Sequence, residues 1–371
     1  MITTLLAALA MLLTLALPTF PEGLTIPILG FLGLVGLAGA GGFLRSAAVR
    51  RELAMLTPWA AGLTLGLLVG VVRGNPMGQA LEDALCYILF ALGLCAGRGA
   101  SRPTWVLWAV LVVCVADTGL AMVRMPSFDL SQYRSAYFHY KVILGHTLVG
   151  LFVAAFLRQQ ARDRVLRGVL AGLVVFSVIG VVATVSRGMV LGMVLGFLTW
   201  LYVRNPTRGL IYGAVGVVIT AVFAATLLEV GQQYLRFGNQ ATVDARVREI
   251  SECLMYFVRM PVFGAGLGAE FVIDGFVVSY THNMLAYHLW KFGLVGSALF
   301  ALPVVALARQ SLRIPRPVRA VVLAGAAMSL VYMVTAASYK SYIVVPMIGM
   351  VVGASFRVAL PAPARSPTVP A

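Results

Sequence analysis

Two arginines and one histidine are the residues whose types and positions best suit chemistry on an anionic substrate. Arg187 stands between Ser186 and Gly188 at a tight hinge, with apolar flanks VVATV before it and MVLGMVLGF after it. Such a hinge does not need an arginine. A guanidinium stays charged beside lipid, so it requires a water-filled cavity or an anion. Snorkelling of Arg187 to a lipid phosphate is the structural alternative.

Arg246 lies in a segment whose apolar residues recur at helical spacing. This apolar stripe consists of Val243, Val247, Ile250, Leu254 and Phe257. On a helix, Arg246 falls at the edge of the stripe, whereas Arg248 and Arg259 fall on the far side. We therefore expect Arg246 to face the protein and to bind an anion, and a structural pair with Glu249 is the alternative. Arg248, an i,i+4 partner of Glu252, is a second candidate for substrate binding.

His282 and Asn283 open a long apolar segment. Histidine takes up a proton near neutral pH, so His282 is the candidate general base, with Asn283 beside it for substrate binding. A helix cap or a bond to a lipid headgroup is the alternative. Lys291 lies roughly 13 Å deeper on the opposite face, and His288 also lies off the His282 face, so we interpret both as packing or topology features.

Other charged and aromatic residues are weaker candidates. In the connection 124–140, Arg134 and Tyr137 could steady phosphate and stack on sugars, whereas an interfacial aromatic belt is the structural alternative. Lys340 lies in an outer turn, where it could assist an anion. Metal-ligand spacing is not apparent in the sequence, so no metal site is predicted.

Four ionisable residues lie in or near apolar segments. Asp117 is a functional candidate by its position, with a solvated helix end as the alternative. We interpret His146 as a core residue hydrogen-bonded to a neighbouring helix. Glu82 and Asp83 begin a predicted span, where acids complement the helix dipole.

Pro261 is expected to end the helix that carries Arg246. Gly264, Gly266 and Gly268 follow it. Because this pattern neither follows a strand nor opens a dinucleotide-binding helix, it predicts only a turn with close backbone approach.

The elements that must position these residues are membrane helices. The chain is 60% hydrophobic and 11% charged, against about 25% charged in a soluble domain. Apolar runs long enough to cross a hydrocarbon core of about 30 Å recur, and in lipid they must be helical. The predicted spans are 2–18, 24–44, 54–72, 83–97, 104–123, 141–157, 168–186, 188–203, 209–228, 283–308, 320–337 and 342–356. The sequence thus predicts an all-α polytopic membrane protein of about twelve transmembrane helices.

These spans form one predicted transmembrane catalytic domain, residues 1–357, followed by a disordered Pro-rich tail, residues 358–371. Its longest connection, residues 229–281, is expected to be periplasmic and to contain short helices. Several glycines of the second span, among them Gly39 and Gly42, are expected to permit close helix approach.

The net charge of +15 is a topology signal. Basic residues cluster in alternate connections, and Lys and Arg stay cytoplasmic because they resist translocation. Both termini are therefore expected inside, and nucleic-acid binding is disfavoured. The first basic residue is Arg45, so residues 2–18 are expected to be a retained span rather than a cleaved signal peptide. The four cysteines predict no disulfide.

Taken as an ordered set, these motifs resemble the O-antigen ligase/polymerase family of bacterial envelope glycosyltransferases. The residues that carry the resemblance are Ser186-Arg187-Gly188, Arg246 with the later Pro261-Val262-Phe263-Gly264-Ala265-Gly266, His282-Asn283 and Phe292-Gly293-Leu294-Val295-Gly296. The specific likeness covers about residues 180–300. An aromatic residue commonly follows the loop arginine of the family by four positions, and Ile250 stands there in this chain.

The resemblance implies a GT-C-like membrane fold and an enzyme at the outer face of the bacterial inner membrane. Such an enzyme joins a glycan from undecaprenyl pyrophosphate to an acceptor hydroxyl without nucleotide sugar, metal or other cofactor. It implies that Arg187 and Arg246 bind the leaving pyrophosphate and that His282 takes the acceptor's proton. The implied partners are the lipid-linked donor, a lipid A-core or glycan acceptor, and membrane lipids.

Three alternatives stay open at this point. A ligase acting on lipid A-core is favoured over a repeat-unit polymerase of the same family, which would differ only in its acceptor. A transporter or flippase of lipid-linked glycans would need broken helices and charges at mid-membrane, for which Lys291 is the strongest candidate. A non-catalytic scaffold is the residual interpretation.

Overall fold

The structure is a computed structural model that describes residues 1–17, 26–45, 49–50, 53–124, 133–183, 186–222, 240–273, 275–335 and 337–360. Within these ranges, the side chains of residues 16, 121, 124, 133–144, 187, 219–222, 240–243 and 337–338 are not described.

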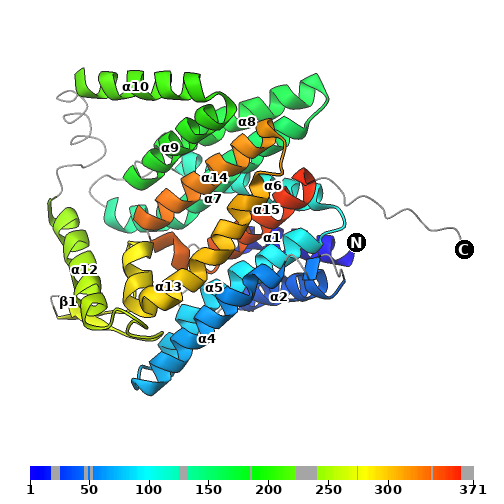
Figure 1. Cartoon of the computed structure of the whole chain (residues 1–371). Coiled ribbons are helices and arrows are strands. Elements are labelled where there is room, and N and C mark those ends of the chain that lie inside the picture. Colours follow the sequence, from blue (N-terminus) through cyan, green and yellow to red (C-terminus); the bar gives the residue numbers. More distant parts are fainter. Residues whose placement is uncertain are drawn as a thin grey trace, which may run out of the picture.

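Helices form nearly all of the described chain (Figure 1). The first half contains α1 (Ile2–Leu13), η1 (Thr14–Ala16), α2 (Ile26–Arg45), η2 (Ala54–Leu56), α4 (Thr57–Val72), α5 (Met77–Gly99), α6 (Pro103–Arg124), α7 (Tyr133–Gln160) and α8 (Arg164–Ala183). The second half contains α9 (Arg187–Arg204), α10 (Pro206–Val222), α12 (Gln240–Arg259), α13 (Met284–Ser311), α14 (Arg316–Thr335), η5 (Ala337–Lys340) and α15 (Val344–Ala359). Two short strands, β1 (Phe271–Ile273) and β2 (Phe276–Val278), complete the elements.

Seven helices among the described residues are long and apolar enough to cross a membrane, and three shorter helices are also apolar. This confirms the prediction of an all-α polytopic membrane protein, whereas the number of about twelve spans stays a prediction. Figure 1 shows α12 and the strands at one end of the molecule, beside the start of α13.

Close helix approach occurs where the sequence predicted it. A side chain at Gly39 of α2 would lie 2.6 Å from the carbonyl oxygen of Leu92 in α5. Gly42 likewise lies against the backbone at Cys95. Because any side chain larger than hydrogen would push the helices apart, these glycines set the distance between α2 and α5.

Two predicted boundaries were wrong. α5 begins at Met77 rather than at 83, so Asp83 lies inside the helix and is fully buried. The prediction that Asp83 complements a helix dipole was therefore also wrong. The predicted outer connection 124–140 is helical from Tyr133 onwards, where α7 begins.

The predicted connection 229–281 has more structure than expected. Its residues 229–239 lie outside the described part of the chain. The rest contains the 20-residue helix α12 and an antiparallel hairpin in which Phe271 pairs with Val278 and Ile273 with Phe276. The sequence predicts short helices here and does not predict the two strands.

An interruption of α13 joins this connection to the membrane helices. Gly293 has a φ of 60° and a ψ of −162°, which breaks the helix. The amides of Leu294 and Val295 donate to the carbonyls of residues 261 and 262 at 2.8 and 3.1 Å, and the amide of Ala265 donates to Trp290 O at 2.7 Å. The glycine-rich turn therefore replaces the hydrogen bonds that α13 loses at its break.

An aromatic cluster packs beneath this junction. Trp290 of α13 contacts Phe271 of β1 with ring centroids 4.6 Å apart, and Tyr287 contacts Tyr339 of η5 at 5.1 Å. Cys253 of α12 is fully buried in the same cluster. These contacts hold α12, the hairpin, α13 and η5 together.

Candidate active site

Arg246 and Glu249 lie one turn apart on α12 and form an ion pair. Arg246 Nη1 donates to Glu249 Oε1 at 2.9 Å and to Oε2 at 3.2 Å. The side chains are 31% and 16% exposed, so neither is sealed from water. Arg246 is thus partly inward-facing, as expected, and it also makes the pair with Glu249 that was the structural alternative.

The apolar stripe predicted for α12 is wrong in part. Val247 and Leu254 are exposed, whereas the small side chain of Cys253 is the one that is fully buried. The helix packs by the face that carries Cys253, Ile250 and Tyr256, where Tyr256 contacts Phe271 and Trp290. The predicted stripe selected apolar residues by their spacing alone, whereas in the structure the face that carries Glu249 and Cys253 is turned inward.

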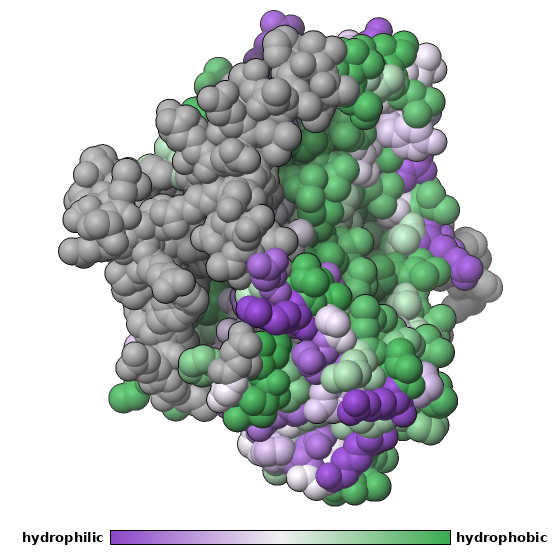
Figure 2. Space-filling model, turned by 90° about the vertical axis from the view of Figure 1, so that its left-hand side faces the viewer, coloured by the Kyte–Doolittle hydropathy of each residue, from purple (hydrophilic) through white to green (hydrophobic). Residues whose placement is uncertain are grey.

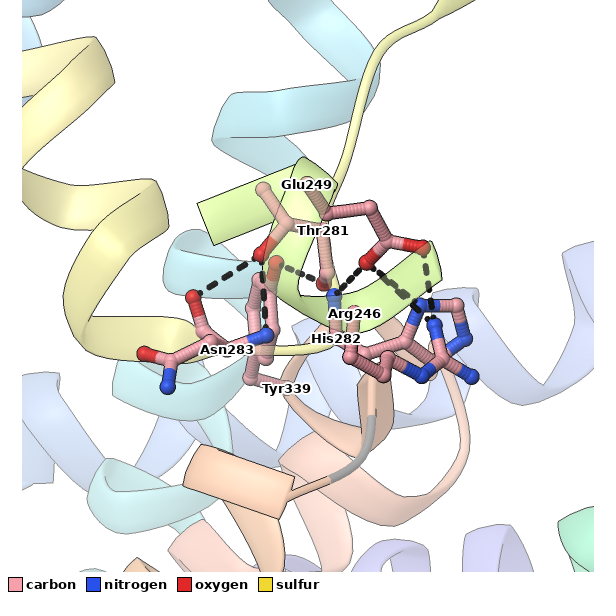
Figure 3. Close-up of polar contacts among 6 residues, drawn as sticks. All are labelled: Arg246, Glu249, Thr281, His282, Asn283 and Tyr339. Carbon is pink, nitrogen blue, oxygen red and sulfur yellow. Dashed lines mark hydrogen bonds and ion pairs between the residues drawn. The ribbon is translucent and has the colours of Figure 1, made fainter. Parts of the chain in front are cut away.

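His282 completes a three-residue cluster with Glu249 and Arg246 (Figure 3). Its backbone amide donates to Glu249 Oε2 at 3.0 Å, and its Nδ1 lies 3.0 Å from the same oxygen. An ionised carboxylate can only accept, so Nδ1 carries the proton in this contact. The other nitrogen, Nε2, then has a free lone pair, and no described residue contacts it. This arrangement suits a general base oriented by a carboxylate.

The segment 281–283 is fixed by local hydrogen bonds. Tyr339 of η5 donates to the carbonyl of Thr281 at 2.6 Å. Asn283 caps α13, since its side-chain oxygen accepts from the amide of Ala286 at 3.0 Å. Thr281 Oγ1 accepts from the amide of Asn283 at 2.8 Å. His282 therefore stands on a backbone held from both sides.

Burial and charge act in opposite directions on the carboxylate of this cluster. Burial raises the pKa of Glu249 above its ordinary value, and the neighbouring Arg246 opposes that rise. Burial also raises the pKa of the nearby Cys253 thiol to about 12, so it stays protonated at neutral pH. Arg246 thus favours the ionised form of Glu249 and limits the rise in its pKa that burial causes.

Arg187 begins α9, with Ser186 as the N-cap residue. The next residue, Gly188, packs directly against Thr335 at the end of α14, and η5 follows closely after Thr335. The backbone of Arg187 therefore lies near the end of the helix bundle that also carries η5 and segment 281–283. Its side chain lies outside the description, so its contact with the cluster stays a prediction.

A second charged cluster occupies the interior, and the sequence analysis did not foresee it. Asp83 of α5 lies 2.8 Å from Lys291 Nζ, and both side chains are fully buried. Lys340 of η5 contacts the other oxygen of Asp83. Gly268 donates its amide to Asp83 Oδ2 at 2.9 Å, and Lys291 also donates to Ala269 O at 2.5 Å. Lys340, predicted to assist an anion, is engaged by a carboxylate of the protein.

The remaining predicted residues lie apart from these clusters or outside the description. Arg248 is on the exposed side of α12. Arg134 and Tyr137 lie in the first turns of α7, where side chains are not described. His146 is buried, as expected of a core residue, and its Nδ1 lies 2.5 Å from Asp117 Oδ2 of α6.

Glu249 is the cluster residue that the sequence did not indicate as a site residue, since it was expected only as a structural partner of Arg246. The signal was present, since an acid three residues after an arginine shares its helix face. Only the proximity of residue 282, far along the chain, distinguishes it from an ordinary helical ion pair.

Hydrophilic residues gather at the lower end of the face shown in Figure 2, next to a broad apolar surface.

Comparison with known families assigns a large part of this region. Residues 172–301 match the family model described as O-antigen ligase. The match contains Arg187, α12, the hairpin and the first half of α13. No curated protein matches the chain.

Proposed function

The chain carries the domain of the O-antigen ligase family over residues 172–301, and we propose that it transfers a glycan from undecaprenyl pyrophosphate to an acceptor hydroxyl. The reaction takes place at the periplasmic face of the bacterial inner membrane, with both termini of the chain in the cytoplasm. The acceptor is lipid A-core, which makes the protein an O-antigen ligase. The observation that carries this proposal is the convergence of Arg246 and His282 on the single carboxylate of Glu249.

The chemistry assigns one role to each residue. The acceptor oxygen attacks the anomeric carbon of the glycan, and the bond from that carbon to the pyrophosphate oxygen breaks. His282 Nε2 takes the hydroxyl proton, for which general-base catalysis typically gives about 10²–10⁴-fold. Arg246 and Arg187 bind the departing pyrophosphate and stabilise the charge that develops on it. The leaving group is then charge-stabilised by protein cations, so the reaction requires no metal.

Transfer with purified components tests this function. Protein in lipid nanodiscs is given a polyprenyl diphosphate-linked glycan and either lipid A-core or a second lipid-linked glycan, with and without chelator. Glycosylated lipid A-core, formed equally in the presence of chelator, supports the ligase. Elongated lipid-linked chains support the polymerase instead.

Two variants connect this activity to the site. Arg246→Ala and Arg187→Ala should each lower transfer by about 10²–10³-fold. Arg259→Ala is the matched control, because Arg259 lies on the exposed side of the same helix and contacts only Met255 among the described residues. Full activity in Arg246→Ala or in Arg187→Ala would remove that residue from the site.

Transport is the alternative of another class. It would need broken helices and charges at mid-membrane: α13 is interrupted at Gly293, but Lys291, the strongest candidate charge, is paired with Asp83 in the interior. Movement of the lipid-linked glycan between leaflets without transfer, in the same nanodisc or liposome assays, is the result that would favour it.

A further inference from the structure

One carboxylate serves two basic groups at the candidate site. Both oxygens of Glu249 accept from Nη1 of Arg246, at 2.9 and 3.2 Å. The oxygen at 3.2 Å, Oε2, also accepts from the backbone amide of His282 and faces its Nδ1, each at 3.0 Å. The positive charge of Arg246 therefore offsets the negative charge that would otherwise stabilise a protonated imidazole.

Arg246 is held by only part of its guanidinium. Among the residues that the structure describes, Glu249 is its hydrogen-bond partner, and the contact uses Nη1 alone. Its Nε and Nη2 make no hydrogen bond to a described residue, and the side chain is 31% exposed. A diphosphate carries more negative charge than one carboxylate and offers more acceptor oxygens, so it competes well for a guanidinium.

We propose that the diphosphate of the donor draws Arg246 away from Glu249, and that Glu249, left with His282 alone, then holds the imidazole as an effective base. This rests on the proposed function for the identity of the anion. In the resting state the ion pair keeps His282 a weak base. When the donor binds, Glu249 loses its pair with Arg246 and interacts with His282 alone.

The proton balance agrees with this sequence of events. The acceptor proton moves to His282 Nε2 as the new bond to the anomeric carbon forms. The proton on Nδ1 stays between the ring and Glu249, whose charge now compensates the imidazolium. The electron pair of the broken bond leaves on the diphosphate, held by the same Arg246 that was released. Deprotonation and departure are thereby linked through one side chain, and water is not activated before the donor is in place.

Few other titratable groups face the cluster from the neighbouring elements that the structure describes. On α12 these are Cys253 and Glu252, which lie further along the helix. Before α13, the ring of Tyr280 lies 5.7 Å from that of His282. From η5, Tyr339 bonds to the carbonyl of Thr281. Arg246 is the charged group that acts most strongly on Glu249.

A titration of His282 tests the proposal without any transfer assay. Protein with ¹³C,¹⁵N-labelled histidine is placed in nanodiscs, and the His282 ring signals are assigned from their loss in His282→Gln. In Arg246→Gln, the midpoint of the His282 titration should rise by about one pH unit, because Glu249 is no longer offset. Arg246→Lys keeps the charge and should leave the midpoint close to that of the unaltered protein.

The matched pair of variants isolates Glu249. In the Glu249→Gln background, adding Arg246→Gln should produce no rise, since there is no carboxylate to release; Glu249→Met, which also lacks the carboxylate, serves if the glutamine variant is not folded. An unchanged midpoint in Arg246→Gln, or an equal rise in both backgrounds, would overturn the proposal.

A ligand completes the experiment. A polyprenyl diphosphate that carries no sugar should raise the midpoint more in the unaltered protein than in Glu249→Gln. The direct effect of its charge on the ring is common to both proteins, so the difference belongs to Glu249. Equal rises would overturn the proposal and leave glycan transfer itself intact. Conversely, the expected titrations in a protein that transfers no glycan would support the ion-pair exchange and refute the proposed function.

Discussion

In two clusters of the described residues, one carboxylate faces two basic side chains, and the clusters differ in burial and in the hydrogen-bonding groups that remain without a described partner. At the candidate site, Glu249 faces Arg246 and His282, and both basic groups are partly exposed, with nitrogen atoms that no described residue contacts. In the interior, Asp83 faces Lys291 and Lys340, and its oxygens also accept from Gly268 and from the side chain of Gln79. The two clusters therefore contain similar charged groups but differ in exposure and in the number of hydrogen bonds within the protein.

Burial and unused hydrogen-bonding capacity explain the difference. Buried charges are tolerated only where they are paired and hydrogen-bonded, as Asp83 and Lys291 are. The ammonium of Lys291 also lies 4.3 Å from the Trp290 ring centroid. The interior cluster thus joins α5 to the glycine-rich turn and to α13, while the outer cluster keeps groups that can meet a substrate. The variants below test whether the interior cluster stabilises the fold and the outer cluster acts on substrate.

The largest effect is expected at the outer cluster. His282→Ala removes the base and should lower the turnover number by about 10²–10⁴-fold. Binding of the donor should change little, because Arg246 and Glu249 remain. The measurement is transfer at saturating donor, together with donor binding measured separately. A loss of binding with unchanged turnover would assign His282 to donor binding rather than to catalysis.

The interior cluster should respond in stability rather than in chemistry. Lys291→Met removes one of the two cations that face the buried carboxylate of Asp83, and it should destabilise the fold by about 3–5 kcal/mol. The double variant Asp83→Leu with Lys291→Met removes both buried charges and should be less destabilised than the single one. Thermal unfolding in detergent or nanodiscs compares them. A double variant that is less stable than Lys291→Met would mean that the cluster is more than a buried pair.

What the sequence could predict follows from how local each feature is. The partly inward position of Arg246, the glycine-rich turn and the start of α13 at Asn283 depend on neighbours within a few residues, and the structure agrees with them. The pair between Asp83 and Lys291 joins residues that lie in separate helices, so no local pattern indicates it. The start of α5 was missed for the same reason, because a buried acid was interpreted as a helix end.

The inward face of α12 and the interruption of α13 also depend on contacts that the local sequence does not indicate. Hydrophobic periodicity depends on the spacing of apolar residues, whereas α12 packs through Cys253 and its Glu249 contacts His282. Gly293 looked like part of a family motif, but its function in the fold is to open α13 so that residues 261–266 can bond to it. A backbone exchange of this kind depends on two distant segments, and either segment alone predicts an ordinary turn or helix.

The junction between the turn and α13 gives a smaller, structural prediction. Gly264 has a φ of 69°, and a side chain there would lie 2.5 Å from Gly293 N. Gly264→Ala should therefore cost about 3 kcal/mol, from left-handed strain and overpacking together. Gly275 has a similar φ of 83° with no atom within 4 Å of the added carbon, so Gly275→Ala should cost only about 1 kcal/mol. Equal losses of thermal stability would show that the close approach at Gly293 is not a constraint.

The smallest effect is expected at Asn283, where the site and the fold meet. Its side-chain oxygen caps α13 through the amide of Ala286. Asn283→Ala should cost about 1 kcal/mol of stability, and Asn283→Asp should restore the cap. If Asn283 acts only as a cap, transfer should follow stability, with Asn283→Asp near the unaltered protein in both. If instead its free amide donates to substrate, Asn283→Asp should be stable yet lose activity, because its carboxylate cannot donate and repels a diphosphate. That outcome would extend the site from His282 to Asn283, which would then bind substrate as well as cap α13.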